Sequence, residues 1–280
     1  MKPIHAEKQY LSVEGITIAY QERNPDQLNT IFFIHGNSGS GRTWIRQLDD
    51  PLFDAFRMVA FDLPGHGESA VPHPSTVYYA VTGLARILAA AIKKLAANKP
   101  YILVGVSLGT NISCECLPEL GAKGIVLISP CIIGEDYPVH EIFKPDADLR
   151  TVFTDDPDEA LIRQTLEACL YKTSRDLIAD MISDYKKVKG NFRSLLYQSV
   201  QDQRYQDEVK LLEQSGLRPL VIFGRTDPIS NINYLDHWQE NVWSKEIHKL
   251  NSASHFAHLD QNDSINQLLY HYVTDSLTDQ

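Results

Sequence analysis

The sequence has few cysteines and no long apolar stretch. No run of about 18 apolar residues occurs in the 280 residues, so we expect no membrane-spanning segment. Its four cysteines form no C-x-x-C pair and stand beside no histidine cluster, which argues against a zinc site. We therefore expect no metal and no cofactor, and we expect buried or half-buried free thiols at Cys114, Cys116, Cys131 and Cys169.

Positive charge is also scarce. Lysine and arginine number 26 against 36 acidic residues, which gives a net charge of −10. Such a surface repels phosphate groups, so neither nucleic acid nor an anionic membrane is an expected partner. The first 15 residues hold a lysine but no apolar core of a secretory signal, so we expect a cytoplasmic protein. The alternative is a periplasmic protein that has lost its signal. The oligomeric state stays open.

Several short segments are apolar at nearly every position. Such runs are typical of strands that are buried on both faces of a parallel sheet. A hairpin is expected at the N-terminal side, from residues 9–13 and 16–21 around Gly15. The buried strands are expected at residues 30–34, 58–61, 101–105, 124–128, 218–224 and 246–250.

Helical patterns fill the spaces between these runs. Residues 81–97 are rich in alanine and leucine with helical spacing, which predicts a crossover between two parallel strands. The buried runs disappear between about residues 134 and 206. In their place the pattern predicts amphipathic helices at 159–171, 176–188 and 191–200, the first with Asp156 as its N-cap and Pro157 as its first residue. A final helix is expected at 264–277. We interpret residues 1–133 and 207–280 as one α/β core domain and 134–206 as a helical lid.

The motif G-V-S-L-G at residues 105–109 follows a predicted strand and precedes a helix-compatible segment. A sharp turn there would hold the Ser107 hydroxyl clear of the sheet, and the flanking glycines would let neighbouring backbone pass close by. Ser107 is therefore the candidate nucleophile. The alternative is a serine that only caps the following helix.

A serine nucleophile needs a general base, and the segment after the last predicted strand offers two histidines. His255 lies nearer the strand end and is the predicted base, while His258 is expected to be structural. Asp227 follows the strand at 218–224 and is the predicted acid that orients His255. The alternative is that Asp227 only caps a helix, in which case Glu135 or Asp136 would be the acid that orients His255.

The loop H-G-N-S-G-S-G at residues 35–41 follows the first buried strand. It can direct a backbone N–H, that of Asn37, at an oxyanion, and Leu108 would supply the second N–H. The alternative is a plain turn, since the lysine of a phosphate-binding loop is missing. Asp62 and His66, in a second turn, are expected to fix loop geometry by hydrogen bonds.

Together, these motifs resemble the α/β-hydrolase family. The resemblance rests on H-G at 35–36, D-L-P-G-H-G-E-S at 62–69, G-V-S-L-G at 105–109, G-R-T-D-P at 224–228 and A-S-H-F-A-H-L-D-Q at 253–261. It implies a mostly parallel eight-stranded sheet, a helical lid and no cofactor. The sequence departs from the common pattern at Thr110, Ser254 and Asp260, where the family usually has Gly, Gly and Glu.

The resemblance also narrows the reaction. A serine nucleophile argues against haloalkane dehalogenases and most epoxide hydrolases, which attack with aspartate. The loop at 35–41 is similar to that of N-acyl-homoserine lactonases. We therefore expect a serine hydrolase that cleaves a small-molecule carboxylic ester or lactone. Carbon–carbon bond hydrolysis, cofactor-free oxygenation and ligand sensing with vestigial turnover are the alternatives.

Overall fold

The computed structural model describes residues 7–278, so part of the N-terminal segment on which the no-signal expectation depends lies outside the described residues. In this part of the chain eight strands form one sheet in the order β1-β2-β4-β3-β5-β6-β7-β8. The first three strands of that order pair antiparallel, and the others pair parallel. The strands are β1 (Glu7–Val13), β2 (Ile16–Arg23), β3 (Thr30–Ile34), β4 (Arg57–Phe61), β5 (Tyr101–Val106), β6 (Gly124–Ile128), β7 (Leu220–Gly224) and β8 (Ile247–Leu250).

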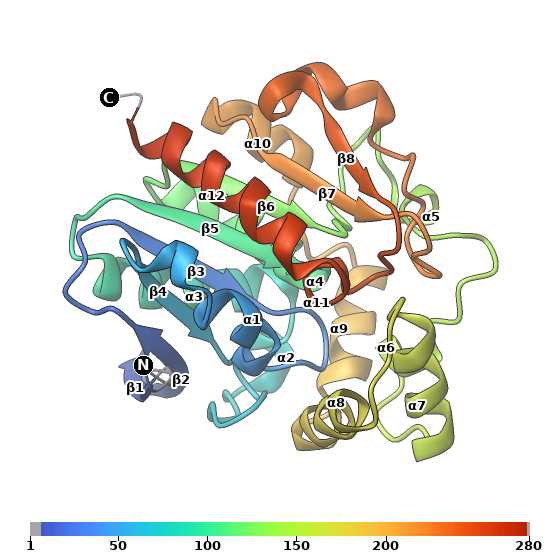
Figure 1. The fold of residues 1–280 in the computed structure, drawn as a ribbon. Coiled ribbons are helices and arrows are strands. Elements are labelled where there is room, and N and C mark those ends of the chain that lie inside the picture. Colours follow the sequence, from blue (N-terminus) through green and yellow to red (C-terminus); the bar gives the residue numbers. More distant parts are fainter. Residues whose placement is uncertain (1–6, 279–280) are drawn as a thin grey trace.

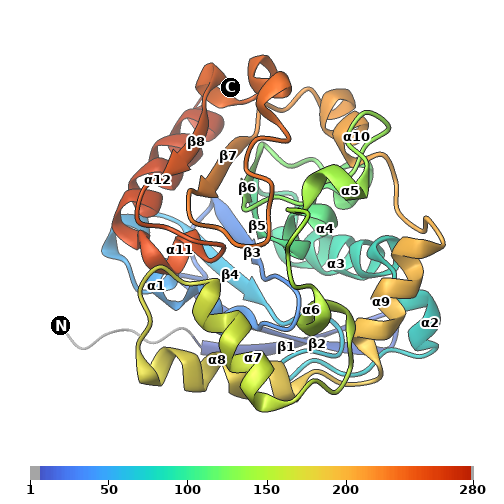
Figure 2. The ribbon, with the colours of Figure 1, turned by 90° about the vertical axis from the view of Figure 1, so that its right-hand side faces the viewer.

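Helices cover both faces of this sheet (Figures 1 and 2). Figure 2 shows α1 and α12 on one side and α3, α4 and α10 on the other. The helices are α1 (Ile45–Leu48), α2 (Ser75–Tyr78), α3 (Val81–Ala96), α4 (Leu108–Cys116), α5 (Val139–Ile142), α6 (Arg150–Phe153), α7 (Glu159–Ala168), α8 (Arg175–Lys187), α9 (Phe192–Gln201), α10 (Glu208–Ser215), α11 (Ala257–Asp260) and α12 (Asn262–Thr278).

The continuous apolar runs follow from this layering. Successive side chains of a strand point to opposite faces. Phe32 and Ile34 pack into the core under α3 and α4, while Ile31 and Phe33 pack into the core under α12. Both cores exclude water, which favours apolar residues at nearly every position of β3. The sheet and its central strands were thus correctly predicted, whereas β8, at the edge of the sheet, is half-buried.

Helices α5 to α9 lie between β6 and α10 in the chain, and α6 to α9 lie together beside the sheet, over the carboxyl ends of its strands (Figures 1 and 2). The chain leaves and re-enters the core at adjacent points. Ile133 N–H donates to the Glu208 carboxylate at 2.8 Å, and Glu208 N–H donates back to Ile133 O at 2.8 Å.

The predicted start of α7 was wrong by two residues. The N-cap is Asp158, whose side chain accepts from Leu161 N–H at 2.8 Å, and not Asp156. A residue before proline avoids the helical region, which disfavours Asp156 as the start. The helix also ends earlier than predicted, at Ala168, because the N–H groups of Tyr171 and Lys172 bond to the Asp260 carboxylate instead.

Candidate active site

Ser107 occupies a strained turn between β5 and α4. Its backbone has φ 53° and ψ −126°, a region that residues with a side chain rarely adopt. Ser107 N–H donates to Ile128 O at 3.0 Å, which ties the turn to β6. A Cβ on Gly105 would lie 2.4 Å from Gly109 O, and one on Gly109 would lie 2.3 Å from Ile34 O. Both glycines are therefore required by close backbone packing, as the motif predicted.

His255 and Asp227 meet at the ends of β8 and β7. His255 Nδ1 lies 2.8 Å from Asp227 Oδ2, and both side chains are buried. The other oxygen, Oδ1, accepts from the N–H groups of Ile229 and Ser230 at 2.8 and 3.0 Å. The structure thus brings the predicted acid and base together.

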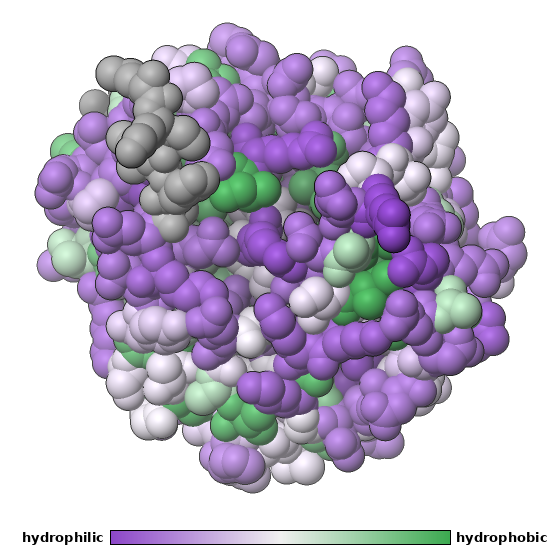
Figure 3. All heavy atoms as spheres, turned by 60° about the horizontal axis from the view of Figure 1, so that its bottom comes forward, coloured by the Kyte–Doolittle hydropathy of each residue, from purple (hydrophilic) through white to green (hydrophobic). Residues whose placement is uncertain are grey.

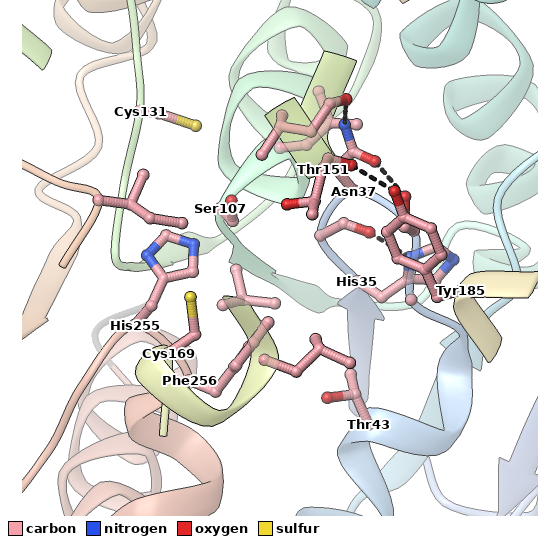
Figure 4. A pocket seen from close by; sticks show the side chains of 18 of the residues that line it. His35, Asn37, Thr43, Ser107, Cys131, Thr151, Cys169, Tyr185, His255 and Phe256 are labelled. Atoms are coloured by element: carbon pink, nitrogen blue, oxygen red, sulfur yellow. Dashed lines mark hydrogen bonds between the residues drawn. The ribbon is translucent and has the colours of Figure 1, made fainter. Parts of the chain in front are cut away.

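The charge state of Asp227 fixes the tautomer of His255. Burial raises the pKa of the Asp227 carboxyl, but the His255 imidazole and the two N–H donors outweigh burial and hold this pKa below its usual value. An ionised carboxylate only accepts hydrogen bonds, so Nδ1 carries the proton. Nε2 is left as an acceptor, and Figure 4 shows the His255 ring turned toward Ser107.

Ser107 and His255 line one cavity of about 220 Å³, together with Asn37 and Leu108. No hydrogen bond joins the Ser107 hydroxyl to His255 in the described part of the chain. Such contacts are often long in enzymes without substrate and tighten on binding. The four predicted residues therefore surround one space in which a carbonyl group could sit.

The two predicted oxyanion donors have no protein acceptor among the described residues. Within residues 7–278, neither Asn37 N–H nor Leu108 N–H donates to a protein acceptor; Leu108 is the first residue of α4, where an N–H has no partner in its own helix. Gly36 lets this loop approach the nucleophile, because a Cβ there would lie 3.1 Å from Ser107 Cβ. Two donors without a protein partner, on residues that line the same cavity, are compatible with the predicted oxyanion site.

The predicted structural roles of Asp62 and His66 are confirmed. The Asp62 carboxylate accepts from Gly41 N–H at 2.8 Å and from Glu68 N–H at 2.9 Å. His66 is buried with Nδ1 3.1 Å from Pro64 O, and burial holds its pKa well below the usual value. The Gly41 bond joins the turn after β4 to the loop that carries Asn37, and the others hold the turn itself.

His258 is structural as well. It is fully buried, with Nε2 2.9 Å from Thr43 Oγ1, and burial lowers its pKa to about 3. It does not line the cavity. The alternative acids also lie elsewhere, since Glu135 and Asp136 are exposed.

The unusual residues of the motifs tie the site together. Thr110 Oγ1 donates to Ser107 O at 2.6 Å and accepts from Cys131 N–H at 3.2 Å. Asp260 accepts from Ser254 N–H at 2.8 Å, and Ser254 Oγ donates to Ala168 O at 3.0 Å. These side chains supply contacts that glycine could not make.

The cysteines are free, and Cys114, Cys116 and Cys169 are buried while Cys131 is half-buried. Cys131 and Cys169 line the cavity (Figure 4). Burial raises the pKa of the Cys131 thiol to about 12, so the thiol stays protonated near neutral pH and is a poor nucleophile. Among the described residues, no group of three or more His, Cys, Asp and Glu side chains could hold a metal ion.

Apolar side chains form most of the cavity wall. They come from the core and from the helices between β6 and β7 and include Ile133, Ile142, Phe143, Val152, Phe153, Leu166, Leu177, Met181, Leu196 and Phe256. The outer surface seen in Figure 3 is predominantly hydrophilic, with small separate apolar areas. No helix in the described chain is long and apolar enough to cross a membrane. Some apolar residues of these helices thus face the cavity, while others, such as Ile162 and Ile178, pack in a small core of their own.

The two arginines of the wall differ in their partners. Arg42 bonds to Asp180 at 3.0 Å and to Asp184 at 3.0 Å, whereas Arg46 donates to the neutral Leu259 O at 2.8 Å and Asn262 Oδ1 at 3.0 Å. These contacts were not predicted, because their partners lie far away in the chain. The charge of Arg42 is therefore compensated, and Arg46 is held by hydrogen bonds to neutral oxygens.

Known proteins share this architecture. The acetyltransferase component of the acetoin cleaving system of Cupriavidus necator is 25% identical over 274 residues, which cover 93% of this chain and 67% of that protein. N-acyl homoserine lactonase AidH complexed with N-butanoyl homoserine superposes with a TM-score of 0.86 at 20% identity, with 98% of each chain covered. A thermophilic esterase superposes with a TM-score of 0.69 at 17% identity, over 96% of this chain and 98% of the esterase.

At these identities the two structures establish the fold alone. The profile of the alpha/beta hydrolase family matches residues 31–268, which include every predicted site residue. The sheet order, the strained turn at Ser107 and this match agree. The chain therefore belongs to the alpha/beta hydrolase family.

Proposed function

We propose that this protein is a serine hydrolase of uncharged carboxylic esters or lactones. The observation that carries the proposal is the placement of Ser107, the His255–Asp227 pair and two unpaired N–H groups around one apolar cavity. Each group matches a requirement of acyl transfer: a nucleophile, an oriented base and donors for the developing charge.

The proposed mechanism has two acyl-transfer steps. His255 Nε2 takes the proton of Ser107 as Oγ attacks the carbonyl carbon, and Asp227 stabilises the resulting imidazolium. The N–H groups of Asn37 and Leu108 bind the oxyanion. His255 then gives its proton to the leaving alcohol, and later activates the water that releases the acid. With a lactone, the leaving alcohol stays attached to the acyl group.

The cavity wall supports an uncharged substrate with an apolar acyl part. Burying an unpaired charge is costly, and Arg42 is already paired with Asp180 and Asp184. We propose that residues 134–206 act as a lid that supplies much of the acyl wall. Because the loop at 35–41 resembles that of N-acyl-homoserine lactonases, these lactones are the finer candidates among the possible substrates.

A pH-stat panel tests the proposal. It sets p-nitrophenyl esters of rising chain length beside N-acyl-homoserine lactones, with wild type, Ser107→Ala and Ser183→Ala, whose exposed serine lies on α8, as the matched control. Fast lactone opening with weak ester cleavage would indicate a lactonase, and the reverse would indicate a carboxylesterase. Turnover of neither would refute the proposal and favour carbon–carbon hydrolysis, oxygenation or sensing.

A further inference from the structure

The side chain of Asn37 is held at both ends of its amide. Asn37 Nδ2 donates to Val152 O at 2.9 Å, and Asn37 Oδ1 accepts from Ser38 Oγ at 2.5 Å. Val152 belongs to α6, outside the core. The Asn37 side chain is therefore joined both to Ser38 in its own loop and to Val152 outside that loop.

Arg193 of α9 continues this chain of hydrogen bonds. It is only 4% exposed, and its Nε donates to Ser38 Oγ at 2.9 Å. Its other nitrogens donate to Asp155 O at 2.9 Å and Tyr185 O at 2.7 Å. The guanidinium also lies over the Tyr185 ring, 3.7 Å from the centroid. Ser38 thus receives one hydrogen bond from Arg193 and passes one on to Asn37.

The burial of Arg193 is costly for a merely structural contact. The oxygens that its guanidinium contacts are a hydroxyl and two carbonyls, and none is a carboxylate. Removing a cation from water is unfavourable unless hydrogen bonds and nearby negative charge replace the water, and the Asp155 and Asp156 carboxylates supply that charge without bonding to the guanidinium. A planar guanidinium can hold three oxygens at fixed angles, which a lysine ammonium cannot do as rigidly.

A second link runs parallel to the first. Ser40 Oγ donates to the buried Asp184 carboxylate of α8 at 2.7 Å. This link holds the far end of the loop, whereas Arg193 acts on the residue next to Asn37. The loop that carries a predicted oxyanion donor is therefore fastened to α8 and α9 by side chains from both helices.

We propose that Arg193 is a positioning residue, which sets the direction of the Asn37 N–H through the Ser38 hydroxyl. The inference rests on the proposed function, because it assigns a task to the same oxyanion site. Removal of an oxyanion donor costs about 10²- to 10³-fold in kcat, and a displaced donor costs somewhat less.

Arg193→Met and Ser38→Ala test the chain from either end. Arg163→Met is the matched control, since Arg163 is an exposed arginine of α7. We expect kcat on the best ester to fall about 10- to 100-fold in both test variants, with KM changed by less than about threefold. The Ki of a trifluoromethyl ketone, whose serine adduct carries an oxyanion, should rise in parallel with the loss of kcat/KM.

The double variant and a structural readout complete the experiment. If the two residues act as one chain, the fold-loss of kcat in Ser38→Ala/Arg193→Met should be at most about twice the fold-loss in the worse single variant. Hydrogen exchange of residues 35–42 should accelerate in Arg193→Met but not in Arg163→Met. Arg193→Lys keeps the charge in case Arg193→Met fails to fold, and should lose part of the activity.

Three results would overturn the inference. They are unchanged kcat in folded Arg193→Met, losses that multiply in the double variant, or a fall in kcat with no rise in the Ki of the ketone. Failure of the proposed function is a different result, namely activity that survives in Ser107→Ala. In that event the exchange data still decide whether Arg193 orders the loop.

Discussion

The two halves of the site are held in different ways. The half that contains Ser107, His255 and Asp227 is fixed by the core, through Ser107 N–H on β6, Asp227 N–H on Gly224 O and the His255–Asp227 bond. The half that contains Asn37 is tied to the core at its two ends, through Leu63 N–H on His35 and Gly41 N–H on Asp62, but its side chains are held from outside the core. The side chains of Asn37, Ser38 and Ser40 all bond to residues between 150 and 193.

Because of this difference, the nucleophile and the base depend on the core, whereas stabilisation of the oxyanion also depends on the outer helices. The nucleophile and base would be preformed wherever the sheet is folded. The oxyanion site would be complete only when helices α6, α8 and α9 are in place, so a displaced lid should reduce kcat more than it reduces the reactivity of Ser107. Substitutions in each half can break or sharpen this contrast.

The largest effect is expected in the core-held half. Ser107→Ala should lower kcat on the order of 10⁵- to 10⁶-fold, because it removes the nucleophile and leaves only the donors and the cavity. The thermal midpoint should stay close to that of wild type, since the deleted hydroxyl lines the cavity and has the Cys131 thiol, a weak hydrogen-bonding group, as its neighbour. Ser183→Ala should retain activity within about twofold. Activity of Ser107→Ala near that of wild type would show that Ser107 is not the nucleophile, and the comparison of the two halves would then fail.

Asp227→Asn should cost about 10⁴-fold in kcat, because an amide favours the wrong tautomer of His255. The pKa of Asp227 lies below its usual value, so the carboxylate is ionised above about pH 4 and the loss should be similar at pH 6 and pH 9. Asp136→Asn is the control, because Asp136 is exposed. A larger loss of kcat in Asp136→Asn than in Asp227→Asn would contradict this role of Asp227 and make Asp136, after β6, the acid that orients His255.

A charged acyl chain tests the wall that both halves share. The kcat/KM of a p-nitrophenyl monoester of succinic acid should be at least about 100-fold below that of p-nitrophenyl butyrate. The reason is that Arg42 already pairs with Asp180 and Asp184. Equal kcat/KM values for the two esters would mean that a cationic side chain is available to the substrate.

The smallest expected effect concerns the point where the outer helices rejoin the core. Glu115 is buried and accepts from Gln206 N–H at 2.9 Å, and burial raises its pKa to about 7. In the unfolded chain this pKa is near 4.3, so between about pH 4.3 and 7 the folded state holds the extra proton. Stability contributed by this group is therefore present at low pH and is lost as pH rises through about 7.

Glu115→Gln should remove that dependence. Urea unfolding should show a gain of about 1–3 kcal/mol at pH 8 and little change at pH 4. Glu119→Gln is the matched control, because Glu119 is exposed and paired with Lys93. A gain at pH 8 in the control as well, or a loss in Glu115→Gln, would show that burial of Glu115 does not govern this pH dependence.

The sequence could predict the parts whose determinants are local. A strand buried on both faces is apolar at nearly every position, as in β3 and β5, and the turn at Ser107 needs glycine at fixed offsets. The meeting of His255 with Asp227 follows from where the parallel strands end, whereas the order of the strands was not predicted.

The contacts of the outer helices could not be predicted in this way. Arg193 and Ser38 are 155 positions apart, and neither has a spacing or motif that points to the other. A buried arginine in an amphipathic helix looks like any solvated arginine until its neighbours are known. The same holds for Glu115, whose burial depends on the segment that returns at Gln206.

Covalent labelling tests the central claim most directly. Wild type would be incubated with a fluorophosphonate, and intact-mass and peptide mass spectrometry would count and locate the adduct, with Ser107→Ala and Asp227→Asn in parallel. We predict one adduct, on Ser107, with slow labelling of Asp227→Asn and none of Ser107→Ala. An adduct on another serine, such as Ser38 or Ser40, or equal labelling of Ser107→Ala, would contradict the assignment of Ser107 as the nucleophile.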